Sequence, residues 1–163
     1  MEIFRYNLHM NLKEEKDMRG FICENCQKWV STEKNTNTIN RNHCPHCLWS
    51  KHVDSQISGD RMSSCKGRMK PIGLSIKNPR IDKWGVEVKG EIMIIHECTI
   101  CRRVSLNRTH SEDSQNEIMN IFEEGKKIPL EKKKSLKTNE IEVLGEESRE
   151  EVEKQIFGSN TPR

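Results

Sequence analysis

Six of the seven cysteines in this 163-residue chain form three Cys-x-x-Cys pairs, and this spacing constrains the fold more than any other feature. The pairs are Cys23/Cys26, Cys44/Cys47 and Cys98/Cys101, and the remaining cysteine is Cys65. Two intervening residues let a tight turn, a zinc knuckle, direct two thiolates toward one metal ion. The 17 residues between the first and second pairs fall within the spacing of four-thiolate zinc sites. We therefore predict that Cys23, Cys26, Cys44 and Cys47 hold one structural zinc ion.

The composition favours metal over a large apolar core as the source of stability. Apolar residues make up only 33% of the chain, and there are four Phe and one Tyr. Small domains with so little apolar surface to bury usually depend on disulfides or metals. The segment from Met1 to Tyr6 lacks the apolar stretch of a signal peptide, and no later segment reaches the roughly 18 apolar residues of a membrane span. We expect a cytoplasmic protein, in which reduced cysteines bind zinc rather than form disulfides.

Cys65, Cys98 and Cys101 supply three ligands of a second predicted zinc site, and the fourth ligand is left open. We expect His96 in this place because it precedes Cys98 by two residues on a predicted strand, with His52 as the alternative. A water molecule there would instead give an open site with catalytic potential. Two further arrangements stay open: Cys65 is an ordinary buried thiol, or the second Cys pair faces the third.

The residues around the knuckles favour short strands. Residues 21–30 read as strand, knuckle turn and strand, and the second knuckle continues into Leu48 and Trp49. Another strand is expected from Val86 to His96, leading into the third knuckle. The stretch around Cys65 and Pro71 indicates connected turns and short strands. This pattern predicts a small β-rich, zinc-ribbon-like domain.

After residue 110 the pattern changes to short amphipathic helices. Ser114–Glu117 forms a capping box followed by an apolar stripe, and Gly125 suits the end of that helix. A second capping box begins at Ser148, and Gly158 follows the helix predicted there. The lysine-rich link between the helices is expected to be solvated and flexible. We divide the chain into an N-terminal arm (1–20), a zinc-binding domain (21–110) and a charged, partly helical and partly flexible tail (111–163).

The segment Arg41-Asn42-His43-Cys44-Pro45 spells the motif after which the RNHCP domain family is named, and the chain resembles this family over about residues 20–113. Further matching segments are Phe21-x-Cys23-x-x-Cys26, Cys47-Leu48-x-Ser50-x-His52-Val53-Asp54, Gly59-Asp60-Arg61, Cys65-x-Gly67-x-Met69-x-Pro71-Ile72, His96-x-Cys98-x-x-Cys101 and Asn107. The resemblance implies a small cytosolic metal-binding domain and supplies no activity. One departure is Arg102, which follows Cys101 where knuckles often carry Gly.

Charge is unevenly distributed along the chain. Residues 1–110 contain 19 Lys or Arg against 12 Asp or Glu, a net charge of +7, whereas residues 111–163 contain 9 against 13, a net charge of −4. Two zinc sites, with four and three thiolates, would lower the first figure to about +4. Trp29 and Trp49 lie in this basic segment and either stack on bases or belong to the core. The candidates for contacts to RNA phosphates are Arg41, Lys51, Arg61, Arg68, Arg102, Arg103 and Arg108.

These features favour a non-enzymatic zinc-binding module that contacts RNA or the ribosome. A second hypothesis is a protein-interaction adaptor that docks a partner through the helices of residues 111–163. A third is a metal-dependent hydrolase that uses His52 and Asp54, which would share one face of a strand, at an open second site.

Two details of the second knuckle bear on these hypotheses. Cys44-Pro45-His46-Cys47 also occurs in thiol oxidoreductases, but no βαβ pattern precedes it here. We interpret His43 and His46 as groups that support the metal site or lie at the surface, rather than as ligands.

Overall fold

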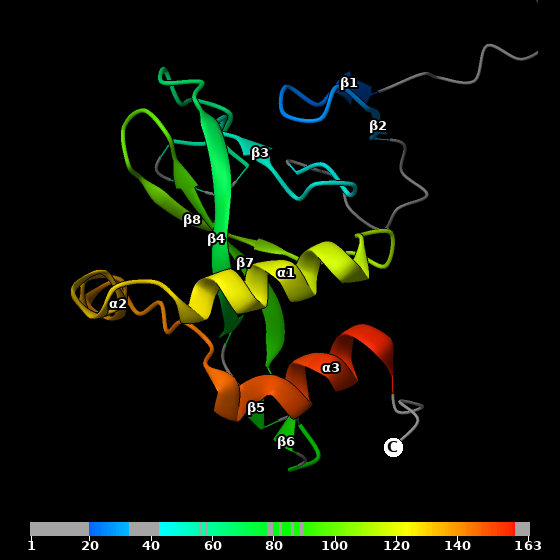
Figure 1. Cartoon of the computed structure of the whole chain (residues 1–163), viewed down its shortest axis with the longest axis vertical. Helices are drawn as coiled ribbons and strands as arrows, with labels where there is room; N and C mark the ends of the chain where they lie inside the picture. Colours follow the sequence, from blue (N-terminus) through cyan, green and yellow to red (C-terminus); the bar gives the residue numbers. More distant parts are fainter. Residues whose placement is uncertain are drawn as a thin grey trace, which may run out of the picture.

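The computed structural model describes residues 20–32, 43–55, 57, 59–77, 80–81, 83–85, 87–88 and 90–158. Its centre is a four-stranded antiparallel sheet, and two short hairpins lie toward opposite ends of the molecule (Figure 1). The sheet contains, in spatial order, β3 (Ser50–Lys51), β4 (Arg68–Lys77), β7 (Glu91–Cys98) and β8 (Val104–Arg108). The hairpins are β1 (Gly20–Ile22) with β2 (Trp29–Ser31), and β5 (Arg80–Ile81) with β6 (Glu87–Val88). The expected small β-rich domain is confirmed, while the N-terminal arm lies, apart from Gly20, outside the described residues.

Strand β7 is buried at every position after Glu91, which explains its uninterrupted apolar run. Successive side chains of a strand point to opposite faces. Ile94 and Ile95 accordingly belong to two different apolar clusters, so both faces of β7 are covered. The strand predicted at residues 86–96 corresponds to β6 and β7 together, although Val86 itself lies outside the described residues.

The longest strand, β4, was not apparent from the sequence. Pro71 and Gly73 indicated turns because proline cannot donate to a strand ladder and glycine weakens a strand interior. In the structure the register between β4 and β7 shifts between these two residues. This irregularity accommodates both of them within a ten-residue strand.

Three helices follow the sheet: α1 (Gln115–Lys126), α2 (Leu130–Thr138) and α3 (Arg149–Phe157). The capping box predicted for α1 is confirmed, since the Ser114 side chain accepts a hydrogen bond from the Glu117 backbone N–H. Ser148 makes no such bond, although Gly158 ends α3 with a φ of 78° as predicted. Helix α2 replaces the solvated link expected there. Its lysine-rich sequence has almost no apolar stripe, which is the signal that would have revealed it.

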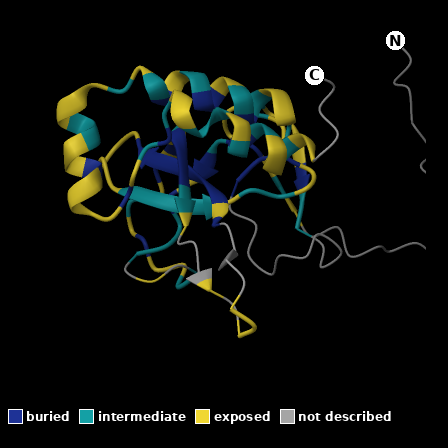
Figure 2. Cartoon of the chain, turned by 90° about the horizontal axis from the view of Figure 1, so that it is seen from below, coloured by how far each residue is buried: buried dark blue, intermediate teal, exposed yellow. Residues whose placement is uncertain are grey.

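The helices complete the core rather than form a separate tail. Ile118, Phe122 and Val152 are at most 2% exposed and pack with Leu74 and Ile94 of the sheet. Figure 2 shows the buried strands lying beneath the helices. A second cluster joins β7 to α2 and to the segment that follows α2. The division at residue 110 therefore does not separate two structural units.

Gly125 has a role that its sequence position did not reveal. Helix α1 continues through it to Lys126, so it does not end the helix. A Cβ atom on Gly125 would lie 2.9 Å from the Cα of Gly73, closer than such atoms approach in real structures. The two glycines let α1 approach β4 closely. None of the described helices combines the length and apolar character that a membrane span requires.

Candidate metal centres and the adjoining pocket

All three Cys-x-x-Cys pairs form the same backbone turn. In each, the first cysteine's N–H donates to the carbonyl five residues later, and the N–H four residues later donates back to the first cysteine's carbonyl. The residue after the second cysteine lies in the left-handed region in every case: Gln27 at φ 60°, Leu48 at 59° and Arg102 at 63°. A residue other than glycine therefore follows the second cysteine in all three knuckles, and not only at Arg102. Glycine would adopt this conformation with the least strain.

The first two knuckles face each other, as the 17-residue spacing predicted. The Sγ atoms of Cys23 and Cys47 lie 3.6 Å apart, and those of Cys26 and Cys44 also lie 3.6 Å apart. All four sulfurs are within 4.8 Å of one another. The alternative pairing of the second knuckle with the third is wrong. A disulfide needs a separation of about 2.05 Å, so the four thiols are arranged around a shared centre rather than cross-linked.

Burial makes the Cys44 and Cys47 thiols of this cluster unfavourable as bare thiolates. Burial, with a further contribution from the Cys26 and Cys23 sulfurs, raises the pKa of the Cys44 thiol to about 11. Burial likewise raises the pKa of Cys47. Reactive cysteines of oxidoreductases have lowered pKa values, so Cys44 lacks this property. A divalent cation at the centre would stabilise all four thiolates at once.

The pairing of three strands assembles a second cluster. His52 follows β3, Cys65 precedes β4, and Cys98 ends β7 opposite Met69 of β4. The Sγ atoms of Cys65 and Cys98 are 3.7 Å apart, and Nδ1 of His52 is 3.3 Å from the Sγ of Cys101. His52, Cys65, Cys98 and Cys101 thus form a four-donor set, and the alternative in which Cys65 is an isolated thiol is wrong.

His96 does not belong to this cluster, so our first choice for the fourth ligand is corrected. Its Nε2 donates to the Leu48 carbonyl at 2.6 Å, and its Nδ1 accepts from the Asn107 side chain at 2.8 Å. Both ring nitrogens are therefore occupied. Complete burial lowers the pKa of His96 to about 3, which matches this neutral tautomer. Two residues of strand also place it about 7 Å along β7 from Cys98.

Gly67 allows the second cluster to close. A Cβ atom at this position would lie 2.8 Å from the Sγ of Cys98 and 3.1 Å from the Ile100 side chain. The carbonyl of Gly67 also accepts a hydrogen bond from the His52 backbone N–H at 2.8 Å. A side chain at position 67 would collide with Cys98, and the Gly67 carbonyl helps to position His52.

His43 connects the second knuckle to helix α1. Its Nε2 donates to both carboxylate oxygens of Asp113, at 3.0 and 2.9 Å, and its ring stacks on that of His110. The backbone N–H of Ser114 donates to the Pro45 carbonyl at 2.8 Å. His43 and Asp113 are both buried, whereas His46 is exposed. His43 is therefore a structural group, as the sequence indicated, and it joins segments 70 residues apart.

Both donor sets fit zinc. Tetrahedral coordination with Zn–S bonds of about 2.3 Å separates the sulfurs by about 3.8 Å, close to the distances found in both clusters. Four thiolates, or three thiolates and one imidazole, are the donor sets of structural zinc sites. Each cluster could hold one metal ion. Cys23, Cys26, Cys44 and Cys47 would hold the first, and His52, Cys65, Cys98 and Cys101 the second.

A comparison with protein-family models matches a range that contains all the donor residues of both clusters. A model of the RNHCP domain matches residues 18–119. The chain belongs to the RNHCP domain family. No curated protein and no solved structure matches the chain. The matched range extends into α1, which is consistent with the burial of that helix against the sheet of the RNHCP domain.

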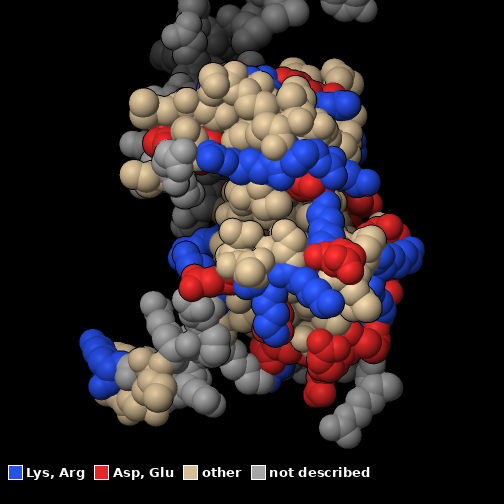
Figure 3. Space-filling view, turned by 90° about the vertical axis from the view of Figure 1, so that its left-hand side faces the viewer, with Lys and Arg blue, Asp and Glu red and all other residues tan. Residues whose placement is uncertain are grey.

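Most basic residues proposed to contact phosphate already have partners within the RNHCP domain. Arg102 pairs with Glu97 at 2.9 Å, Arg108 pairs with Glu91 at 3.1 Å, and Arg103 donates to the Ser55 carbonyl. Lys51 pairs with Glu24. Arg41 lies outside the described residues. Figure 3 shows Lys and Arg side chains crossing one face in a band, with many carboxylates below it.

Arg61 and Arg68 differ from this group. Within the described part of the chain, neither guanidinium forms an ion pair, and both side chains are exposed. Arg68 lies over the ring of Trp49, 5.5 Å from its centroid. Trp29 is 47% exposed and Trp49 is half-buried, so the alternative in which both tryptophans belong to the core is wrong.

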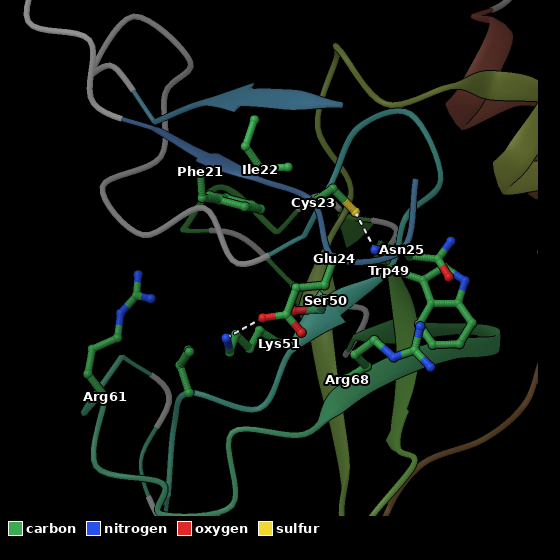
Figure 4. A pocket seen from close by; sticks show the side chains of 11 residues that line it. Phe21, Ile22, Cys23, Glu24, Asn25, Trp49, Ser50, Lys51, Arg61 and Arg68 are labelled. Carbon is green, nitrogen blue, oxygen red and sulfur yellow. Dashed lines mark hydrogen bonds and ion pairs between the residues drawn. The ribbon is translucent and has the colours of Figure 1, made fainter. Parts of the chain in front are cut away.

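Arg61, Arg68 and Trp49 line one pocket of about 240 Å³ between the first knuckle and the β3–β4 edge of the sheet, shown in Figure 4. Its walls combine apolar and polar side chains from four segments of the chain. The lining residues are Phe21, Ile22, Cys23, Glu24, Asn25, Trp49, Ser50, Lys51, Val53, Arg61 and Arg68. Sequence reasoning found the cations and Trp49 but not Phe21 or Ile22, which read as strand residues.

Proposed function

We propose that this RNHCP domain is a non-enzymatic zinc-stabilised module that binds RNA, whether free or within a ribosome. The observation that carries the proposal is the pocket beside the first metal centre, where Arg61 and Arg68 border the half-buried faces of Phe21 and Trp49. Phosphate groups attract such cations whatever the base sequence, and aromatic rings stack on bases. The knuckles would hold these side chains in fixed positions.

The donor sets support a structural role for the metals. A catalytic zinc keeps one position for water or substrate. The second cluster fills that position with His52, the residue on which the hydrolase hypothesis depended. Asp54 instead accepts a hydrogen bond from the Arg61 backbone N–H at 3.1 Å. His52 thus belongs to the second donor set, whereas Asp54 binds the backbone at Arg61.

The adaptor hypothesis required helices with apolar faces available to a partner. The central apolar residues of α1 and α3 are buried against the sheet, with Phe122 and Val152 at 0% exposure, whereas Phe157 at the end of α3 is 40% exposed. A partner would therefore find little continuous apolar surface on these two helices. This arrangement favours the RNA hypothesis over the adaptor.

Fluorescence anisotropy with a labelled single-stranded RNA, measured over a series of salt concentrations, tests the proposal. The logarithm of affinity should fall with the logarithm of salt concentration, and each phosphate contact contributes a slope of about −0.7 for a single strand. Arg61→Ala and Arg68→Ala should each weaken binding and make the slope less negative by about that amount. Lys154→Ala, which removes one positive charge from α3, is the matched control and should leave the slope unchanged. Absence of RNA binding by the zinc-loaded protein would refute the proposal.

A further inference from the structure

We propose that the pocket beside the first knuckle receives one unpaired nucleobase, so that the RNHCP domain selects single-stranded nucleic acid over duplex. This inference rests on the proposed function and names the part of the RNA that the site recognises. The occupant is a base presented with its two flanking phosphates.

The walls of the pocket match the faces of a base. Phe21, Ile22 and Val53 supply apolar surface, and Ile22 is 52% exposed despite its size. On another wall the guanidinium of Arg68 lies over the ring of Trp49, 5.5 Å from its centroid. Bases stack on both aromatic rings and guanidinium planes. Figure 4 shows Phe21 and Ile22 along one side, with Trp49 and Arg68 together on another.

The charges around the pocket place phosphates at its rim rather than inside it. Glu24 pairs with Lys51 in the middle of the pocket and offsets that lysine's charge. Arg61 and Arg68, whose guanidinium groups form no ion pair within the described part of the chain, lie on opposite sides of this pair in Figure 4. A base between them would have a guanidinium near the phosphate on either side. This disposition distinguishes a base pocket from a general basic surface.

A paired base could not enter. Within a duplex the faces of each base are covered by its neighbours, and the major groove of an RNA helix is too deep and narrow for side chains to read. A concave pocket lined by stacking groups therefore requires a base that has left the stack. The first metal centre contributes directly, because Cys23 both lines the pocket and belongs to the first donor set.

The test compares three probes of equal length: a single-stranded RNA, its duplex, and an abasic strand with the same phosphates. The reporter is Trp49 in a Trp29→Phe/Trp84→Phe background, which leaves one tryptophan in the chain. Single-stranded RNA should quench Trp49 and bind at least tenfold more tightly than the duplex or the abasic strand. Single-stranded DNA should behave like single-stranded RNA, because the pocket reads the base rather than the sugar.

Variants separate stacking from charge. In the wild-type background, Phe21→Ala should weaken binding of single-stranded RNA by roughly 5- to 150-fold, the range for losing one stacked base, while the salt slope stays unchanged. Arg68→Lys keeps the charge and removes the guanidinium plane, so it should lose affinity in the same way even if Phe21→Ala folds poorly. Trp29→Leu alters the exposed tryptophan outside the pocket and is the control. Zinc content should match wild type in each variant.

The outcomes distinguish this inference from the proposed function. Equal affinity for all three probes, with Trp49 fluorescence unchanged, would overturn the base pocket and leave RNA binding through phosphates intact. Binding of none of the probes would overturn the proposed function and this inference together.

Discussion

The assignment of His52 rather than His96 to the second metal centre leads to opposite behaviour of two histidine variants. His52→Ala removes one of four zinc ligands. Structural zinc sites bind with about 10–16 kcal/mol, so an equal share for one of four ligands is about 2.5–4 kcal/mol. Each 1.4 kcal/mol is a factor of ten, and the second site should therefore bind zinc roughly 10²- to 10³-fold more weakly. The first site should be unaffected.

His96→Ala should leave both sites loaded and destabilise the fold instead. The substitution removes a ring that is 0% exposed and leaves the Leu48 carbonyl and the Asn107 amide without their partner. Each buried polar group left unsatisfied costs about 1–3 kcal/mol. The Leu48 carbonyl is buried and the Asn107 amide only half-buried, so the free energy of unfolding should fall by at least about 1–3 kcal/mol before any cavity is counted. His96→Gln offers both a donor and an acceptor and should recover part of the loss.

Native mass spectrometry after competition with a chelator measures zinc per chain, and chemical denaturation of the loaded proteins measures stability. Wild type and His96→Gln should retain two zinc ions, whereas His52→Ala should retain one. A His96 variant that folds with one zinc, beside a His52→Ala protein that keeps two, would refute the ligand assignment.

Three further predictions address the neighbouring structure. Gly67→Ala should release the second zinc in the same chelator assay, because the added methyl would lie 2.8 Å from the Cys98 sulfur; retention of both ions would show that the backbone can move aside. Phe122→Ala should lower the free energy of unfolding by about 3–5 kcal/mol, as expected for a fully buried ring, whereas a loss below about 1 kcal/mol in urea denaturation would contradict the packing of α1 into the core. Gln27→Gly should raise the free energy of unfolding by up to about 1 kcal/mol in the same denaturation experiment, because glycine adopts the left-handed backbone at this exposed position without strain. A lower free energy of unfolding would argue against strain at that knuckle.

The knuckles and the first donor set could be predicted because their determinants are local. A Cys-x-x-Cys turn needs only four residues, and the distance along the chain between two such turns restricts which of them can meet. The capping box of α1 is local in the same sense, since Ser114 contacts a residue only three positions later. In each case the interacting groups are specified by a short stretch of sequence.

The second donor set depends on strand register, which the sequence does not display. His52 approaches Cys101 only because β3 pairs with β4 and β4 pairs with β7. The two-residue spacing from Cys98 favoured His96, but that spacing does not reveal that both His96 nitrogens already bind Leu48 and Asn107. Strand β4 and helix α2 were missed for a related reason, because tertiary packing stabilises sequences whose local signals are weak or contrary.

The two metal centres occupy different places in the architecture and should not be equivalent in their effects. The second centre joins His52 after β3 to Cys65 before β4 and Cys98 at the end of β7, so its loss would release three strands of the main sheet at one end. The first centre holds the β1–β2 hairpin, whose small apolar cluster is separate from the helix-covered core. Loss of the first zinc should therefore leave that core folded.

The pocket proposed to bind a base lies on the boundary between these two parts. One wall comes from the β1–β2 hairpin and the other from β3 and β4. Cys23 and the Glu24–Lys51 ion pair are two of its links across that boundary. An exposed ion pair contributes at most about 1 kcal/mol, which is too little to hold the hairpin in place without metal. Nucleic-acid binding should consequently depend on the first zinc even where the remainder of the fold does not.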